Sequence, residues 1–162
     1  MDEIGPFGVV AGALTRPPGR WTAATAADAV VAGAVVAGTA NLVNLLDLRP
    51  GRAAKVVLAC SLPMVAAPGA AGDVIAGPVG ATVGALPDDL GERAMLGDAG
   101  ANALGALLGA TAAATLGRRS LVAVASTVVA LTLVSERVSF TEVIERTAVL
   151  RGLDRLGRRP AP

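Results

Sequence analysis

The stretch AVVAGAVVAGTANLVNLL, residues 29–46, decides the fold class, because it carries no charge and is rich in alanine, valine and leucine. Four further uncharged windows follow at 56–72, 74–87, 99–117 and 120–135. A helix needs about 20 apolar residues to cross the hydrocarbon core of a bilayer, so each window must recruit flanking residues to span it. The sequence therefore predicts an all-α, polytopic transmembrane bundle of about five helices.

The composition favours membrane residence and excludes several classes of function. Of the 162 residues, 53% are hydrophobic and 17% are charged, which is too apolar for an ordinary soluble domain. A net charge of +1 provides no basic surface for nucleic acid. With one cysteine and no histidine, the chain has no disulfide framework and no zinc or haem site that needs imidazole or several thiolates. Any bound metal ion must use oxygen ligands.

The chain divides into three predicted segments. Residues 1–28 form a short apolar segment whose acidic start, Asp2 and Glu3, differs from a secretory signal. We expect this segment to be an interfacial piece, a misassigned start or the remnant of a longer, truncated chain. Residues 29–135 form the transmembrane bundle, and residues 136–162 form a tail.

Basic residues and a capping pattern predict the topology and the tail. The tail and the loops at 47–55 and 88–98 hold ten of the basic residues, which places them in the cytoplasm. The excess of arginine over lysine is typical of GC-rich bacterial genomes, so the membrane is predicted to be a bacterial plasma membrane. In the tail, Ser139 and Glu142 match a capping box, and apolar residues recur at helical spacing. We expect a cytoplasmic amphipathic helix, with packing on the membrane surface favoured over substrate contact.

Small residues recur four positions apart in the predicted helices. Such pairs let two helix backbones approach closely in lipid, although a chain this rich in alanine and glycine also produces them by chance. The pairs are Gly33 with Ala37, Ala34 with Gly38, Gly80 with Gly84, and Gly105 with Gly109.

Two polar clusters flank the predicted spans on the cytoplasmic side. Asn41, Asn44 and Asp47 are three residues apart, which places them along one helix face that ends at the membrane surface. In the second cluster, Asp98 stands between Gly97 and Gly100 just before an apolar window, where its carboxylate can cap a helix or ligate a cation. Ionisable groups at a membrane boundary favour a functional site.

Both clusters resemble signatures of the polyprenyl-phosphate N-acetylhexosamine-1-phosphate transferases, the family of the phospho-N-acetylmuramoyl-pentapeptide transferase of peptidoglycan synthesis. The family carries a loop N-x-x-N-x-x-D-G-x-D-G and, two spans later, a stretch M-G-D-x-G-S-x-x-L-G. The resemblance covers roughly residues 29–135, the carboxy-terminal half of such an enzyme. The residues that fit the first motif are Asn41, Asn44 and Asp47, and those that fit the second are Gly97, Asp98, Gly100, Leu104 and Gly105.

The resemblance implies a phosphoglycosyl transfer in cell-envelope glycan synthesis. An oxygen of a polyprenyl phosphate attacks the β-phosphate of a UDP-sugar, and UMP leaves. The family uses Mg²⁺ to neutralise the charge that develops in phosphoryl transfer. The resemblance therefore implies Asp98 and Asp47 as catalytic and metal-binding residues. Substrate-binding roles are implied for Asn41, Asn44, Gly97 and Gly100. Arg49, Arg52 and Lys55 could meet a diphosphate, or they could serve only as positive-inside anchors.

Several departures from the family pattern favour a second hypothesis. Pro50 and Ala101 replace a loop aspartate and a serine, and no histidine-rich loop can exist. The family's adjacent-aspartate motif lies in an amino-terminal half with no counterpart here, and the pair Asp88-Asp89 is more typical of a solvated turn. The chain could therefore act with a missing half or as a homodimer. Alternatively, it could be a non-catalytic relative that binds lipid phosphate or scaffolds envelope-synthesis partners.

Overall fold

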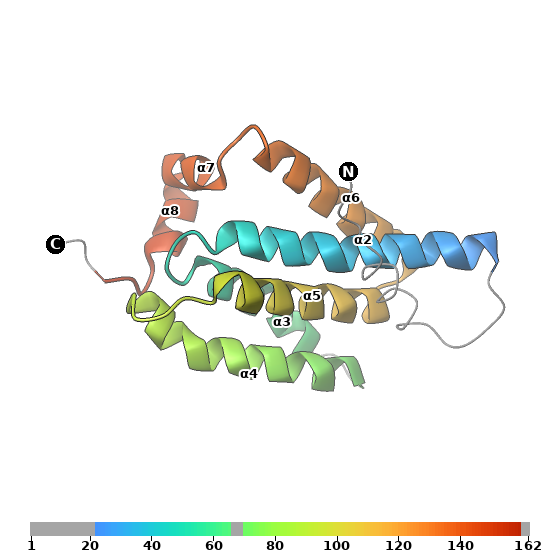
Figure 1. Cartoon of the computed structure of the whole chain (residues 1–162), viewed down its shortest axis with the longest axis horizontal. Coiled ribbons are helices and arrows are strands. Elements are labelled where there is room, and N and C mark those ends of the chain that lie inside the picture. The colour runs from blue at the N-terminus through green and yellow to red at the C-terminus, as the bar shows by residue number, and fades with distance from the viewer. Residues whose placement is uncertain (1–21, 66–69, 160–162) are drawn as a thin grey trace.

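The computed structural model describes residues 22–65 and 70–159, so most of the predicted 1–28 segment lies outside the described residues. Within these ranges the chain is all-α, as predicted, with seven helices and no strand (Figure 1). The helices are α2 (Ala23–Leu46), α3 (Arg52–Val65), α4 (Ala70–Leu90), α5 (Gly97–Thr115), α6 (Arg118–Ser135), α7 (Phe140–Arg146) and α8 (Ala148–Arg155).

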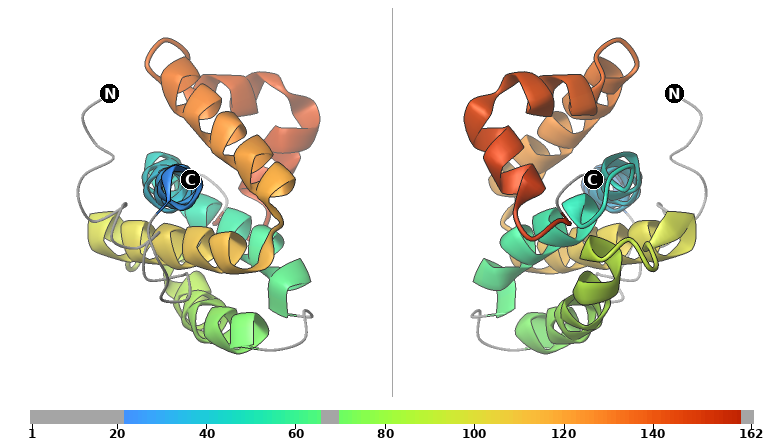
Figure 2. Two further views of the ribbon diagram at one scale, coloured as in Figure 1. Left: turned by 90° about the vertical axis from the view of Figure 1, so that its right-hand side faces the viewer. Right: turned by 90° about the vertical axis from the view of Figure 1, so that its left-hand side faces the viewer.

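The long helix α2 is the centre of the arrangement. It packs mainly against α5 and α6, while α3 packs against α4. Seen along α2, α6 with α7 and α8 lies on one side of it, and α5 and α4 lie on the other (Figure 2). Thr22 begins the helix with a capping box, in which its hydroxyl accepts a hydrogen bond from the Thr25 amide and the Thr25 hydroxyl accepts one from the Thr22 amide.

Glycines on α5 allow α2 and α5 to approach closely. A Cβ added at Gly105 would lie 2.7 Å from the Ala40 Cα, and one added at Gly109 would lie 2.8 Å from the Val36 Cα. These are backbone atoms, so no side-chain rotation could relieve the overlap. The close contact predicted from the Gly105 and Gly109 pair is therefore confirmed.

The other predicted small-residue contacts have mixed outcomes. Gly38 lies against Val128 of α6, as a helix-contact residue should. On α4, in contrast, a Cβ added at Gly80 or Gly84 would meet no atom of the described residues within 4 Å. The predicted contact at this pair is therefore not made within the described part of the chain.

A matched pair of substitutions tests this packing. In a helix, Gly→Ala normally stabilises by about 0.5–1 kcal/mol, and Gly84→Ala should behave in this way. Gly109→Ala should instead lower the free energy of unfolding by about 1–3 kcal/mol, because the added methyl group overpacks the contact with α2. Denaturant unfolding of both variants in one mild detergent measures the difference. Equal stability of the two variants would contradict the proposed close contact.

Several helix boundaries differ from the predicted windows. The break predicted at Asp73 lies earlier, because α3 ends at Val65 and α4 begins at Ala70, so Asp73 is in the first turn of α4. The helix α3 begins at Arg52, so the last four residues of the predicted 47–55 loop lie in its first turn. The helix α2 begins at Ala23, within the predicted 1–28 segment.

The tail forms two short helices instead of one amphipathic helix. They are separated at Thr147, whose backbone is extended. Ser139 precedes α7, but its side chain makes no capping hydrogen bond, so the predicted capping box with Glu142 is not formed. The helix α8 packs on the rest of the protein through Asp154, which is buried, while Val149 and Leu153 are exposed.

By length and apolar composition, two of the described helices could cross a bilayer. They are α2, with its 24 residues, and α6, with 18. Such helices also occur in the cores of soluble proteins and, near an amino terminus, in signal sequences. The helical fold class is thus established for the described residues, and its placement in a membrane belongs to the proposed function.

Candidate functional site

The loop between α2 and α3 and the loop between α4 and α5 meet at one end of the molecule, where they enclose a hollow of about 450 Å³. Both sequence clusters contribute to this end of the molecule. The lining residues are Asp47, Leu48, Arg49, Pro50, Asp89, Glu92, Arg93, Ala94 and Met95.

Asp47 connects the two clusters directly. It ends α2, is 5% exposed, and its Oδ2 accepts a hydrogen bond of 2.8 Å from the amide of Gly97, the first residue of α5. The carboxylate thus satisfies a free amide at the start of another helix, a role that the sequence suggested for Asp98. Burial raises the pKa of Asp47, the bond from Gly97 opposes this, and the charges of Asp89 and Asp98 raise the pKa further.

Asp98 lies beside this junction in the first turn of α5 and is exposed. It does not line the hollow, and its charge contributes to the raised pKa of Asp47. The preceding Gly97 has a φ of +64°, a conformation that favours glycine at this turn. Gly100 follows within the first turn and is half-buried.

The two asparagines of the first cluster do not line the hollow. The Asn41 side chain donates a long hydrogen bond of 3.5 Å to the Thr132 hydroxyl of α6, which places it at a helix contact. Asn44 is half-buried, and its backbone carbonyl accepts from the amide of Asp47. Their spacing correctly indicated one helix, but the sequence could not indicate which neighbour that face meets.

The three basic residues of the α2–α3 region have different surroundings. Arg49 is exposed and lines the hollow. Arg52 is 3% exposed, and its guanidinium donates to both carboxylate oxygens of Asp154, at 2.7 and 3.3 Å. It also donates to the Thr141 hydroxyl at 2.9 Å. Of the three, Arg49 is therefore the one placed to meet a ligand in the hollow.

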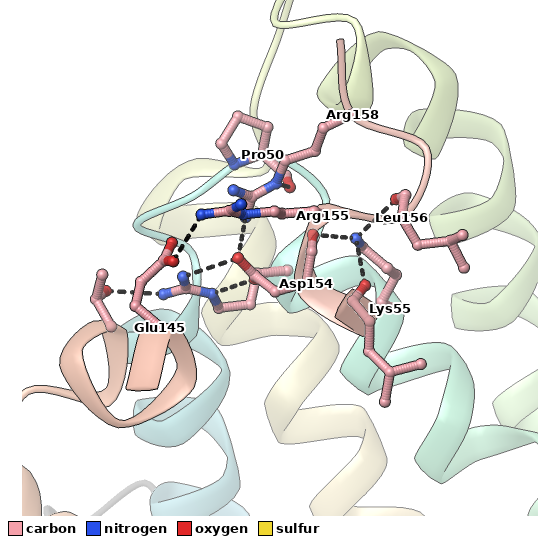
Figure 3. A network of polar contacts seen from close by, with 10 residues as sticks. Pro50, Lys55, Glu145, Asp154, Arg155, Leu156 and Arg158 are labelled. Atoms are coloured by element: carbon pink, nitrogen blue, oxygen red, sulfur yellow. Dashed lines mark hydrogen bonds and ion pairs between the residues drawn. The ribbon is translucent and has the colours of Figure 1, made fainter. Parts of the chain in front are cut away.

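Lys55 and Arg158 complete a polar contact between the tail and the α2–α3 region (Figure 3). The Lys55 ammonium donates to three carbonyls at the end of α8, those of Leu153, Asp154 and Leu156, at 2.6–3.1 Å. Arg158 pairs with Asp154 at 2.9 Å and donates to the Pro50 carbonyl. We call Arg52, Lys55, Asp154 and Arg158 the tail clasp.

The clasp shifts the pKa values of its members. Burial lowers the pKa of Lys55, with a further contribution from the charge of Arg158. Burial alone would raise the pKa of Asp154, but the hydrogen bond from Arg52 and the surrounding cations outweigh it, so this pKa is lowered. Asp154 is therefore ionised in the clasp at neutral pH.

Asp89 is a buried residue of the hollow that the sequence analysis misjudged. Asp88 agrees with the expected solvated turn, since its side chain is 54% exposed and pairs with Arg93 at 2.6 Å. The neighbouring Asp89 is only 4% exposed, so the prediction is wrong for this residue. The signal that could have identified Asp89 is its place at the end of an apolar window, in the same predicted loop, 88–98, as Asp98.

The carboxylates near the hollow do not form a complete protein metal cage. Among residues 22–65 and 70–159, no group of three or more acidic, cysteine or histidine side chains is close enough to hold a metal ion by itself. Mg²⁺, however, usually takes one or two carboxylates and keeps waters or substrate phosphates as its other ligands. The negative charge around Asp47 fits such a partly open site.

Comparison of the chain with protein-family models, with curated proteins and with solved structures found no match.

Proposed function

We propose that the chain is a multi-pass protein of a bacterial plasma membrane with the site of a phosphoglycosyl transferase. The hydrogen bond between Asp47 and Gly97 carries the proposal. It joins the two motifs that resemble the transferase family, although 50 positions separate them in the chain. Chance likeness of two separate motifs gives no reason for a residue of one to bind a residue of the other.

The proposed substrates are a polyprenyl phosphate and a UDP-N-acetylhexosamine. A phosphate oxygen of the lipid forms a bond to the β-phosphorus of the nucleotide, and the bond between this phosphorus and the bridging oxygen breaks. UMP leaves with that oxygen, and a sugar diphospho-lipid remains. Mg²⁺, when bound, supplies neutralisation of the charge on the diphosphate.

The chain's own residues have distinct roles in this proposal. Asp47 and Asp98 supply the carboxylates toward the metal, and Arg49 supplies a guanidinium that can pair with phosphate oxygens. Gly97 and Gly100 shape the turn that starts α5. Arg52 and Lys55 act on substrate only indirectly, by holding the tail against the α2–α3 loop.

The membrane placement rests on α2, on α6 and on the apolar windows of the sequence. In this orientation the hollow and the tail lie on the cytoplasmic side, where a UDP-sugar is available. The outward-facing apolar side chains of α8, including Val149 and Leu153, then lie toward the membrane surface.

UMP release provides the test of this function. The protein is expressed from its native locus with any in-frame upstream continuation, reconstituted in phospholipid vesicles, and mixed with polyprenyl phosphate, a UDP-N-acetylhexosamine and Mg²⁺. We expect UMP release that requires all three and that falls strongly in Asp98→Asn. A folded protein that forms no lipid-linked product from any such donor would exclude the transfer reaction.

One observation favours a non-catalytic alternative. Pro50 stands where the family has its second loop aspartate, and its carbonyl is bound by Arg158 of the tail. A site with fewer carboxylates could bind lipid phosphate without transferring a sugar. Retention of polyprenyl phosphate by the protein in vesicles, without UMP release, would support this alternative.

A further inference from the structure

Asp89 carries a buried oxygen whose partner is missing from the described part of the chain. Its Oδ2 is inaccessible to solvent and has no hydrogen-bond partner there. Burying an unpaired charged group is costly, and such groups in proteins usually have an ion, a water or another polar partner. Asp89 is also one of the residues that line the hollow.

The surroundings of Asp89 have an excess of negative charge. Asp89 and Asp47 both line the hollow, and the charge of Asp89 raises the pKa of Asp47. Glu92 adds a third acidic side chain at the exposed edge of the same hollow. Two cations line the hollow as well: Arg93 pairs with Asp88, and Arg49 is exposed. The nearby Lys55 is bound to the carbonyls of α8.

We propose that Asp89, together with Asp47, binds a divalent cation in the hollow. Two carboxylates are what Mg²⁺ commonly takes from a protein, and the open hollow leaves room for water or phosphate oxygens as the remaining ligands. Asp89 is not among the residues that the family resemblance implies. It supplies from the last turn of α4 a carboxylate that the first motif lacks at Pro50.

This inference deepens the proposed function and rests on it for its biological purpose, but cation binding is measurable without any substrate. A protein that binds the cation and releases no UMP would contradict the transfer reaction alone. If the Asp89→Asn variant released UMP as fast as the wild-type protein, this result would contradict the inference alone.

Mn²⁺ is a suitable probe, because its electron paramagnetic resonance signal measures the free ion directly. The matched variants are Asp89→Asn and Asp88→Asn, which remove one negative charge each from adjacent positions. We expect the dissociation constant for Mn²⁺ to rise at least about tenfold in Asp89→Asn and to stay near the wild-type value in Asp88→Asn. Equal weakening in both variants would show nonspecific attraction and overturn the proposal.

Thermal unfolding in detergent provides a second measurement. Without metal, Asp89→Asn should be at least as stable as the wild-type protein, because it removes a buried charge that has no partner. Mn²⁺ should raise the unfolding temperature of the wild-type protein and of Asp88→Asn, but not that of Asp89→Asn. A wild-type protein that shows neither Mn²⁺ binding nor stabilisation would also overturn the proposal.

Asp47→Asn keeps the inference testable if Asp89→Asn fails to fold. Its amide oxygen can still accept the hydrogen bond from Gly97, while its charge is gone. We expect Mn²⁺ binding to weaken at least about tenfold in this variant as well. Unchanged binding in Asp47→Asn would exclude the two-carboxylate site.

Discussion

Arg52→Met is expected to lower the free energy of unfolding by about 3–5 kcal/mol, the usual cost of removing one partner from a buried ion pair. Arg52 and Asp154 are 3% and 6% exposed, and their shortest contact is 2.7 Å. Without Arg52, the Asp154 carboxylate would keep Arg158 as a partner but lose its two shared hydrogen bonds. Chemical denaturation in detergent measures the loss.

Two controls separate the clasp from general effects of charge. Arg146→Met removes an exposed partner of Glu142 on α7 and should change stability by at most about 0.5 kcal/mol. The double variant Arg52→Met with Asp154→Leu should recover only part of the stability, because it removes the unpaired Asp154 carboxylate but leaves the largely buried Arg158 without its ion-pair partner. If Arg52→Met were as stable as the wild-type protein, the clasp would have no structural role.

The clasp also has a defined pH dependence. The pKa of Asp154 is lower in the folded protein than its ordinary value of 3.8, so the folded state favours the ionised carboxylate. The contribution of the ionised Asp154 to the stability of the fold is therefore fully present above the ordinary pKa and is lost as the pH falls through the lowered pKa. The stability difference between the wild-type protein and Arg52→Met should shrink over the same range.

Local patterns in the sequence were sufficient to predict most of the helices. The uncharged windows at 29–46 and 120–135 lie within α2 and α6, and the window at 99–117 overlaps α5, because an apolar run without charges must be buried or placed in lipid. Two helices were predicted over residues 56–87 with the break at Asp73, but α3 ends at Val65 and α4 begins at Ala70, where no charge marks the boundary. Hydropathy alone cannot locate an end that no polar residue marks.

Long-range pairing explains why the site was predicted only in part. Arg52 and Asp154 are 102 positions apart, so no local pattern indicates that Arg52 pairs with the tail. The same limit applies to α8, which was expected to be an amphipathic helix on the membrane surface. Its contact with the protein through Asp154 was not predicted, because Arg52 and Lys55, which bind the end of the helix, lie far away in the sequence.

The proposed chemistry of Asp47 can be separated from its structural role by a single substitution. Asp47→Asn retains an oxygen that can accept the hydrogen bond from the Gly97 amide, so the junction of α2 and α5 should persist. It removes the negative charge proposed to face the metal. We therefore expect UMP release to fall at least about 100-fold, the upper range for loss of even an indirect metal-site contact.

Stability should move in the opposite direction from activity in this variant. The pKa of Asp47 is raised above its ordinary value of 3.8, mainly by burial, so ionisation of this group opposes folding. This cost is absent below the ordinary pKa and is complete above the raised one. At neutral pH without metal, Asp47→Asn should thus be at least as stable as the wild-type protein, and the difference should disappear in acid.

Asp73→Asn serves as the matched control, because it removes an exposed acid in the first turn of α4 that does not line the hollow. UMP release should be unchanged in this variant. Unchanged release in Asp47→Asn would exclude a role for its charge in transfer. Joint loss of release and stability in Asp47→Asn would instead assign Asp47 to the helix junction alone, since only a chemical role lets activity fall while the fold remains intact.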